Sequence, residues 1–453
     1  MSQPALPTLG DLIRVFAKIG LLGFGGPAAQ IALMHRIVVE EKRWLSEGRY
    51  LHALNYCMLL PGPEAQQLAT YIGWLARGVK GGIAAGILFV LPGAVIMLAL
   101  SVLYALFAEL PLMQGVFYGI KCAVLAIVVQ ALLRIGGRAL KTSALRLIAL
   151  AAFCALFLFA LPFPLVVLSA GVIGFLLHRT WPGTIVASGG HGAGKGGAHS
   201  GSIDAAIEDG RIQHTKSSAT RFMLQTTLWL TLWLAPVAVL WLALGPDDLL
   251  TRLGLFFAQM AAVTFGGAYA VLAYVAQEAV STYGWLSAKE MLHGLALAET
   301  TPGPLILVLQ YVGFLAGFRD AVWGGIAGGI IASLLVLWVT FVPSFLWIFA
   351  GAPYAERLRS MPGISAALAA ITAAVTGVIA SLALWFALHV LFARVDLWRS
   401  GPFTLNLPDW ATLDPAALAL TLAALVLTLR FKLGVGWLVL IFAATGLART
   451  ALV

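Results

Sequence analysis

The 453-residue sequence contains few charged residues, and this deficit excludes most soluble folds. Asp, Glu, Lys and Arg make up 10% of the chain and hydrophobic residues 61%, whereas soluble domains average about 25% charged residues. Many apolar runs reach the roughly 20 residues that a membrane-spanning helix needs. The composition therefore predicts an all-α polytopic membrane protein that lies in the lipid bilayer.

Cysteines and enzyme motifs are also scarce. The three cysteines, Cys57, Cys122 and Cys154, stand singly in apolar runs, and the eight histidines form no cluster. A segment from Gly189 to Lys195 has the spacing of a phosphate-binding loop, but Gly196 stands where Ser or Thr would bind magnesium. We therefore expect no metal site, no cofactor and no enzymatic activity.

The formal net charge of +9 is explained best by cytoplasmic loops, which are rich in Lys and Arg in membrane proteins. No basic stripe interleaved with aromatic residues appears, so nucleic acid is not an expected partner. The most basic segments, residues 133–146 and 179–221, are placed inside the cell. The charged loop at 40–49 then falls inside as well, and the Asp247-Asp248 turn falls outside.

Three short motifs occur twice, each time 241 residues apart. The pairs are Phe24-Gly25-Gly26-Pro27 with Phe265-Gly266-Gly267-Ala268, Trp44-Leu45-Ser46 with Trp285-Leu286-Ser287, and Pro61-Gly62-Pro63 with Pro302-Gly303-Pro304. A constant offset between three pairs predicts two homologous halves. The predicted segments are an N-terminal repeat (1–178), a cytoplasmic Gly/Ser-rich flexible linker (179–221), a connecting transmembrane helix (222–251) and a C-terminal repeat (252–453).

The apolar runs predict helices that are interrupted at both motifs in each half. The expected helices cover 12–39 (interrupted at 23–27), 50–60, 64–76, 81–107, 115–133, 144–161, 165–177, 222–244, 255–274 (interrupted at 266–267), 290–318 (interrupted at 302–304), 325–348, 366–391, 416–429 and 433–447. If the interrupted elements are re-entrant hairpins, the two repeats are inverted in the membrane, as in many secondary transporters. If the first element instead spans the membrane, the halves are parallel, and the loop charges fit this arrangement less well.

The repeated interruptions predict an anion site. Unpaired backbone groups cost several kcal/mol each in lipid and are tolerated where they line a cavity. A helix that begins inside the membrane directs free N–H groups and a positive dipole end at that cavity. The alternative is that the glycines only permit close helix packing and the prolines are kinks. The predicted contacts are Gly25, Gly26, Pro27, Pro61, Gly62, Pro63, Gly266, Gly267, Pro302, Gly303 and Pro304.

Polar side chains within the apolar runs extend this prediction. Lys121 lies too far from either end of its run to reach water easily, so it is predicted to offset the anion's charge, with an ion pair to Glu64 as the alternative. Lys18 is a second candidate, or a lysine that reaches the membrane surface. Gln30 could donate hydrogen bonds to oxyanion oxygens. Glu64 and Glu299, next to the Pro-Gly-Pro motifs, are candidate proton carriers, or simply caps of helix ends.

These motifs resemble the chromate ion transporter family in its long, two-domain form. The resemblance is carried by Phe24-Gly25-Gly26-Pro27, Trp44-Leu45, Leu60-Pro61-Gly62-Pro63-Glu64-Ala65 and Gly119-Ile120-Lys121. It implies export of chromate from the bacterial cytoplasm across the inner membrane, with resistance to chromate and with sulfate as a competitor. Coupling to the proton motive force or to anion exchange is expected.

Other readings of the sequence stay open. A sulfate or general oxyanion permease, an anion channel and a membrane scaffold without turnover are the alternatives, and a homodimer is compatible with the sequence. The second half has Ala268 where the first has Pro27, and Leu305 where the first has Glu64. We therefore expect the two halves to contribute unequally.

Overall fold

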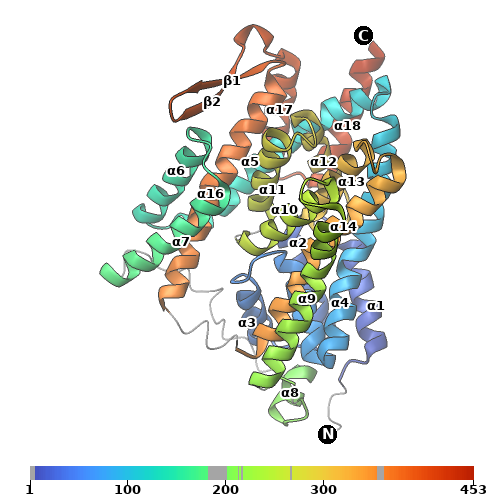
Figure 1. The fold of residues 1–453 in the computed structure, drawn as a ribbon, viewed down its shortest axis with the longest axis vertical. Helices are drawn as coiled ribbons and strands as arrows, with labels where there is room; N and C mark the ends of the chain where they lie inside the picture. Colours follow the sequence, from blue (N-terminus) through green and yellow to red (C-terminus); the bar gives the residue numbers. More distant parts are fainter. Residues whose placement is uncertain are drawn as a thin grey trace. The chain divides into compact units, whose positions relative to one another are not determined.

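The computed structural model describes residues 6–181, 201–212, 214–215, 218–265, 268–354 and 362–452 (Figure 1). Helices dominate this part of the chain. Six of them are long and apolar enough to cross a membrane, namely Glu64–Phe107, Pro111–Ala139, Phe163–Thr180, Ala219–Leu244, Gly325–Tyr354 and Gly363–Leu391. The prediction of an all-α polytopic membrane protein is thus confirmed.

The chain folds into two compact units, and each takes part of both predicted halves. Unit 1 consists of Met1–Leu98, Gly189–Ala268 and Thr301–Met361, and unit 2 of Ala99–Ser188, Tyr269–Thr300 and Pro362–Val453. The units therefore do not coincide with the sequence repeats, and the repeat boundaries stay a prediction.

Unit 1 contains the helices on both sides of the predicted interruptions. They are α1 (Leu9–Leu22), α2 (Gly26–His35), the π-helix η1 (Arg36–Glu41), α3 (Glu47–Cys57), the first part of α4 (Glu64–Phe107), α8 (Ser202–Glu208), α9 (Ala219–Leu244), α10 (Leu249–Val263), η3 (Leu305–Leu307), α13 (Val308–Arg319), α14 (Gly325–Gly351) and η4 (Ala352–Tyr354). Helix α14 packs against α9, α10 and α13. Two indole N–H groups tie α9 to α14, from Trp233 to the carbonyl of Val339 (2.9 Å) and from Trp338 to that of Leu232 (2.8 Å).

Unit 2 is built around one long helix that packs against three others. Its elements are the end of α4, α5 (Pro111–Ala139), α6 (Ser143–Phe157), α7 (Phe163–Thr180), α11 (Ala268–Gln277), the π-helix η2 (Glu278–Thr282), α12 (Ala288–Thr300), α16 (Pro362–Leu391), β1 (Val395–Ser400), β2 (Phe403–Pro408), η5 (Trp410–Thr412), α17 (Pro415–Leu429) and α18 (Val435–Leu452). Helix α16 contacts α5, α6 and α7, and α5 also packs against α17 and α18 (Figure 1). A Cβ on Gly119 of α5 would lie 1.8 Å from the carbonyl oxygen of Phe442 on α18, so this glycine permits the close approach of the two helices.

The two halves repeat their local backbone geometry at the offset of 241 residues. The π-helix η1 ends with a bond from Lys42 N–H to the Ile37 carbonyl (2.9 Å), and η2 ends with the equivalent bond from Tyr283 to Glu278 (2.8 Å). In the same way, Trp44 N–H donates to the Val38 carbonyl and Trp285 N–H to that of Ala279. These shared bonds support the prediction of two homologous halves, whereas their inverted orientation stays a prediction.

The structure differs from the sequence prediction in two places. A hairpin of β1 and β2 stands where no element was expected, although the turn Gly401-Pro402 and the alternation of apolar and polar residues are strand signals. The linker 179–221 was expected to be flexible throughout, but residues 201–212 are folded and include α8. Residues 182–200, with the loop-like segment from Gly189 to Lys195, lie outside the described residues.

Candidate functional site

The first predicted interruption separates α1 from α2. Helix α1 ends at Leu22, and Gly25 and Gly26 take positive φ angles of 87° and 75°, which glycine adopts far more cheaply than other residues. Helix α2 then begins with Pro27 in its first turn, where a missing N–H costs nothing. The sequence prediction of two short helices at this motif is confirmed.

The Pro-Gly-Pro motifs interrupt the chain in the same way in both halves. Gly62 has a φ of 106° and Gly303 a φ of 96°, and new helices begin at Glu64 and at Leu305. Both φ angles lie in the left-handed region that favours glycine. A substitution at either position would therefore strain the backbone, whatever the space around it.

Two reciprocal hydrogen bonds join the interruptions of one half to those of the other. Gly62 N–H donates to the carbonyl of Thr264 (3.0 Å), and Gly303 N–H donates to that of Gly23 (3.0 Å). Gly303 lies 241 residues after Gly62, and Thr264 lies 241 residues after Gly23. The same contact is thus made twice with the roles of the halves exchanged, as in an interface with two-fold symmetry.

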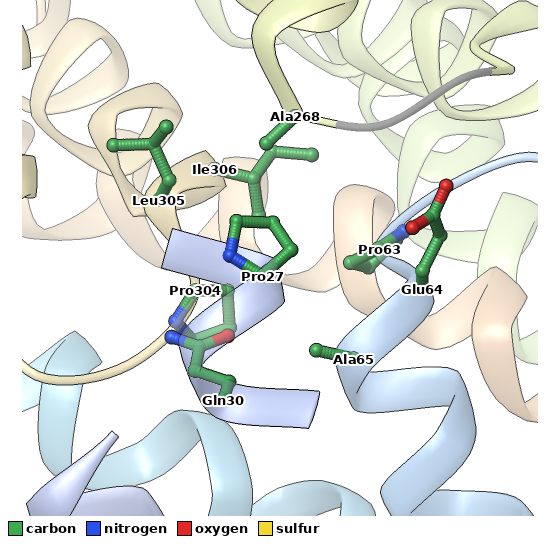
Figure 2. A pocket seen from close by; sticks show the side chains of 9 residues that line it. All are labelled: Pro27, Gln30, Pro63, Glu64, Ala65, Ala268, Pro304, Leu305 and Ile306. Carbon is green, nitrogen blue, oxygen red and sulfur yellow. The ribbon is translucent and has the colours of Figure 1, made fainter. Parts of the chain in front are cut away.

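A small cavity of about 20 Å³ lies in unit 1 where four helices begin (Figure 2). This volume is enough for about one water molecule and is far below the roughly 300–1,000 Å³ of pockets that hold organic ligands. The lining residues come from the starts of α2, α4, α11 and η3, and are Pro27, Gln30, Pro63, Glu64, Ala65, Ala268, Pro304, Leu305 and Ile306.

The cavity combines helix dipoles with a single ionisable side chain. The first N–H groups of a helix have no partner within that helix, and its N-terminal end carries roughly half a positive charge. Glu64 is the ionisable residue of the lining, beside Pro63 at the start of α4 (Figure 2). The electrostatic character of the cavity thus depends on whether this carboxyl group is protonated.

The side chain of Gln30 bridges two interruptions of the chain. It is fully buried, and its Nε2 donates to the carbonyl of Gly23 (3.0 Å) and to that of Gly303. Its Oε1 is buried and has no hydrogen-bond partner among the described residues. Both Nε2 hydrogens bond to the backbone in this structure, and the role of Gln30 in binding an oxyanion stays a prediction.

A second buried amide, that of Gln67, stabilises the Pro-Gly-Pro interruption of the first half. Its Nε2 donates to the carbonyl of Pro61 (2.7 Å). The corresponding positions in the second half are Val271 for Gln30 and Val308 for Gln67. The polar support of the cavity thus comes from the first half, which agrees with the expected inequality of the halves.

The other predicted site residues lie in three different settings. Lys18 is on the exposed face of α1 with Arg14, and neither residue lines the cavity. Gly266 and Gly267 lie outside the described residues. Pro302 packs against α4, because a Cβ on Gly93 would lie 2.2 Å from its carbonyl oxygen. The binding roles of these residues stay predictions.

Lys121 and Glu299 belong to unit 2. The Nζ atom of Lys121 lies 4.7 Å from the ring centroid of Tyr118, and Tyr118 Oη donates to Asp414 (2.7 Å). Glu299 is buried and accepts a hydrogen bond from Tyr269 Oη (2.8 Å). Within the described residues, no group of three His, Cys, Asp or Glu side chains could hold a metal ion.

Interrupted helices that meet around an internal cavity, together with six apolar spans, define a multi-pass membrane protein with a small internal site. The chain belongs to the chromate transporter family. The model of that family matches residues 10–175 and 251–447, one match in each predicted half. No solved structure matches the chain at a significant level.

Three curated relatives illustrate this membership. A "Probable chromate transport protein" of Synechococcus elongatus is 30% identical over 91% of this chain and 95% of its own length. "Chromate transport protein" is the name of two others, from Cupriavidus metallidurans (29% identical, 82% of this chain and 81% of its own length) and Pseudomonas aeruginosa (31%, 82% and 79%). The bacterial relatives and the apolar helices together support a multi-pass bacterial membrane protein.

Replacing Gln30 by leucine tests the importance of the bridged interruptions. The carbonyl of Gly303 would lose this donor, whereas that of Gly23 would keep its bond from Gly303 N–H; a buried acceptor left without a partner costs roughly 1–3 kcal/mol. We expect substrate flux to fall at least about tenfold, since 1.4 kcal/mol corresponds to a factor of ten. Gln114→Leu, at an exposed position, is the control and should keep its flux. Unchanged flux in Gln30→Leu would mean that the amide bridge is dispensable.

Proposed function

We propose that the protein is a secondary transporter that exports chromate from the cytoplasm and thereby confers resistance to it. Membership of the chromate transporter family supports this substrate. The observation that carries the proposal is the meeting of four helix starts at one small cavity, joined by the reciprocal bonds of Gly62 and Gly303. Helix N-termini are ready-made sites for oxyanions, and chromate is a small tetrahedral dianion.

The backbone is the main source of positive potential in the proposed site. Free N–H groups in the first turns of α2 and α4, and at the corresponding starts in the second half, would bind the oxygens of the anion. The prolines at these starts leave the cavity rim apolar, which strengthens the electrostatic attraction by lowering the local dielectric constant. Lys121 is proposed as the cation that offsets the remaining charge.

Alternating access is proposed to follow from the repeat. With the basic loops on the cytoplasmic side, inverted repeats would rock about the cavity and expose it to one side at a time. The reciprocal Gly62–Thr264 and Gly303–Gly23 bonds are the proposed pivot of this motion, because each of them joins an interruption of one half to an interruption of the other. The inner membrane is the proposed location.

Proton coupling is proposed to involve Glu64, with Glu299 as a second candidate. An ionised Glu64 would repel an anion in the same cavity, so the anion should enter when the carboxyl group carries a proton. Glu299 is held by Tyr269 and could exchange a proton through that hydroxyl group. Binding of the anion and protonation of the protein would thus be linked.

Uptake of radiolabelled chromate into inside-out membrane vesicles tests the proposal, with a proton gradient present or absent and with sulfate as competitor. We expect gradient-dependent accumulation of chromate that vesicles without the protein do not show. Sulfate flux without chromate flux would overturn the substrate and indicate a sulfate permease. Conduction that follows the membrane potential without coupling would indicate a channel, and no flux of either anion would indicate a scaffold.

A further inference from the structure

The first helix after each Trp-Leu-Ser motif begins with a serine cap, but the two copies complete the cap differently. In the second half, Ser287 N–H donates to Glu290 (2.8 Å), and Glu290 N–H donates to Ser287 Oγ (3.3 Å). This is the reciprocal capping box that satisfies two unpaired N–H groups. In the first half, Arg49 stands at the position of Glu290, so α3 has no acid at the position that completes the box, although Glu47 lies in its first turn.

Asp204, from the linker between the halves, takes the place of the missing acid. Its Oδ2 accepts a hydrogen bond from Ser46 N–H (2.5 Å), the bond that Glu290 accepts in the second half. Its Oδ1 accepts from Nε of Arg49 (3.0 Å). The Asp204 side chain is 5% exposed, so solvent screens this ion pair far less than one on the surface.

Residues 201–212, which contain Asp204, are called the α8 segment. This segment packs against the loop before α3. Ser202 and Ile203 donate backbone hydrogen bonds to the carbonyls of Arg43 (3.1 Å) and Trp44 (2.9 Å). Ile203 and Ala206 are fully buried. Backbone pairing and apolar burial thus place the Asp204 carboxylate at the start of α3.

A second contact of the linker reaches the helix that follows the Pro-Gly-Pro motif. His214 Nε2 donates to the carbonyl of Trp74 (2.7 Å), and its ring packs edge-on against the indole, with ring centroids 5.2 Å apart. Burial lowers the pKa of His214, while its bond to the Trp74 carbonyl acts in the opposite direction. Trp74 lies just before the non-helical residues Arg77 and Gly78 that end the first part of α4.

The two contacts hold the outer ends of the two helices that Pro61-Gly62-Pro63 connects. Helix α3 leads into the motif from Ser46, and the first part of α4 leads away from it toward Trp74. A shift of either helix would move Gly62 and its bond to Thr264. The linker is therefore attached where it can fix the position of the first-half interruption.

We propose that Asp204 is a positioning residue. It supplies, from the linker of the same chain, the capping acid that α3 lacks at the position of Arg49, and so fixes α3 and the Pro-Gly-Pro interruption. The linker then stabilises the first repeat and does more than connect the two halves. This inference concerns the site of the proposed function, but its structural core, the cap on α3, does not depend on chromate being the substrate.

Amide hydrogen exchange on the full-length protein in detergent tests the cap without reference to transport. We expect Asp204→Ala to speed exchange at the start of α3 and in the α8 segment by about tenfold, in line with measured effects of cap removal. The matched control is Asp209→Ala, which removes an acid on the same segment whose side chain pairs with Arg211 at the surface. Unchanged exchange at the start of α3 in Asp204→Ala would overturn the inference.

A double variant separates the cap from the seating of the linker. Asp204→Ala with Arg49→Glu rebuilds in the first half the capping box that Ser287 and Glu290 form in the second. We expect slow exchange to return at the start of α3 while the α8 segment continues to exchange fast. Failure of this rescue would mean that Asp204 does not act as the cap.

The same variants, assayed for anion flux, show whether the cap serves transport. We expect Asp204→Ala to lower the maximal flux about tenfold, with the concentration for half-maximal flux unchanged, and the double variant to recover it. Recovered exchange without recovered flux would refute the positioning role. If the wild type carries sulfate and not chromate, the comparison is made with sulfate, so the two proposals fail separately.

Discussion

Replacing Glu64 by glutamine is expected to abolish chromate accumulation driven by a proton gradient while chromate exchange continues. Glutamine resembles the protonated acid in shape and in lack of charge. An ionised carboxylate 4 Å from a unit negative charge raises the energy by about 4 kcal/mol at an effective dielectric constant of 20. Deprotonation of Glu64 would thus weaken anion binding by roughly three orders of magnitude. A permanently neutral side chain removes this switch.

Two assays on the same vesicles distinguish coupling from binding. Accumulation under a proton gradient should fall at least about tenfold in Glu64→Gln, because the variant cannot release a proton to reject the anion. Exchange of labelled external chromate for unlabelled internal chromate needs no net proton movement and should become independent of pH. The matched control is Glu109→Gln, at an exposed position outside the cavity. Full gradient-driven accumulation in Glu64→Gln would show that this carboxyl group does not couple transport.

The position of each interruption could be predicted from the sequence because the signal is local. Glycine next to proline marks an end of one helix and a start of the next, and the constant offset of 241 residues repeats this signal. The observed starts at Gly26 and Ala268 lie within these motifs, and the start at Glu64 follows its motif directly. Local backbone preferences were thus sufficient to predict where the half-helices begin and end.

The contacts between the interruptions could not be predicted, because they join residues that are far apart in the chain. Nothing near Gly62 indicates that its N–H donates to Thr264, and nothing near Gln30 indicates Gly303 as its acceptor. The role of Gln30 illustrates the consequence: an amide in a predicted anion site was expected to bind the anion, whereas its Nε2 bonds to two carbonyls.

The linker was misjudged for a related reason. Its composition is rich in glycine and serine, which is typical of flexible chains, and a single aspartate in it carries no local signal. Asp204 becomes significant once Arg49 is compared with Glu290, since the first copy of the capping box then lacks its acid. A comparison of the two repeats position by position could have revealed that missing partner.

Replacing Lys121 by glutamine is expected to lower chromate flux at least about a hundredfold, while the protein stays folded and inserted in the membrane. Lys121 lies about 15 Å along α5 from its first residue, at 1.5 Å per residue, so its ammonium group is placed deep in a span. A cation there is costly unless it faces a partner or a pathway. Its Nζ atom lies 4.7 Å from the ring centroid of Tyr118 on the same helix.

A purely structural role for Lys121 makes a different prediction, which thermal unfolding in detergent can separate from the transport role. If Lys121 serves only to make a cation–π contact with the ring of Tyr118, Lys121→Gln should lose about 0.5–2 kcal/mol of stability and keep its flux. If Lys121 offsets the charge of the anion, chromate should stabilise the wild type against heat and should not stabilise the variant, because a ligand raises stability only through binding to the folded state. Lys141→Gln, at an exposed loop position, is the control for loss of one positive charge. Normal flux in Lys121→Gln would exclude Lys121 as the cation that offsets the anion's charge, and the helix starts around the cavity and Lys18 would remain as the proposed sources of positive potential.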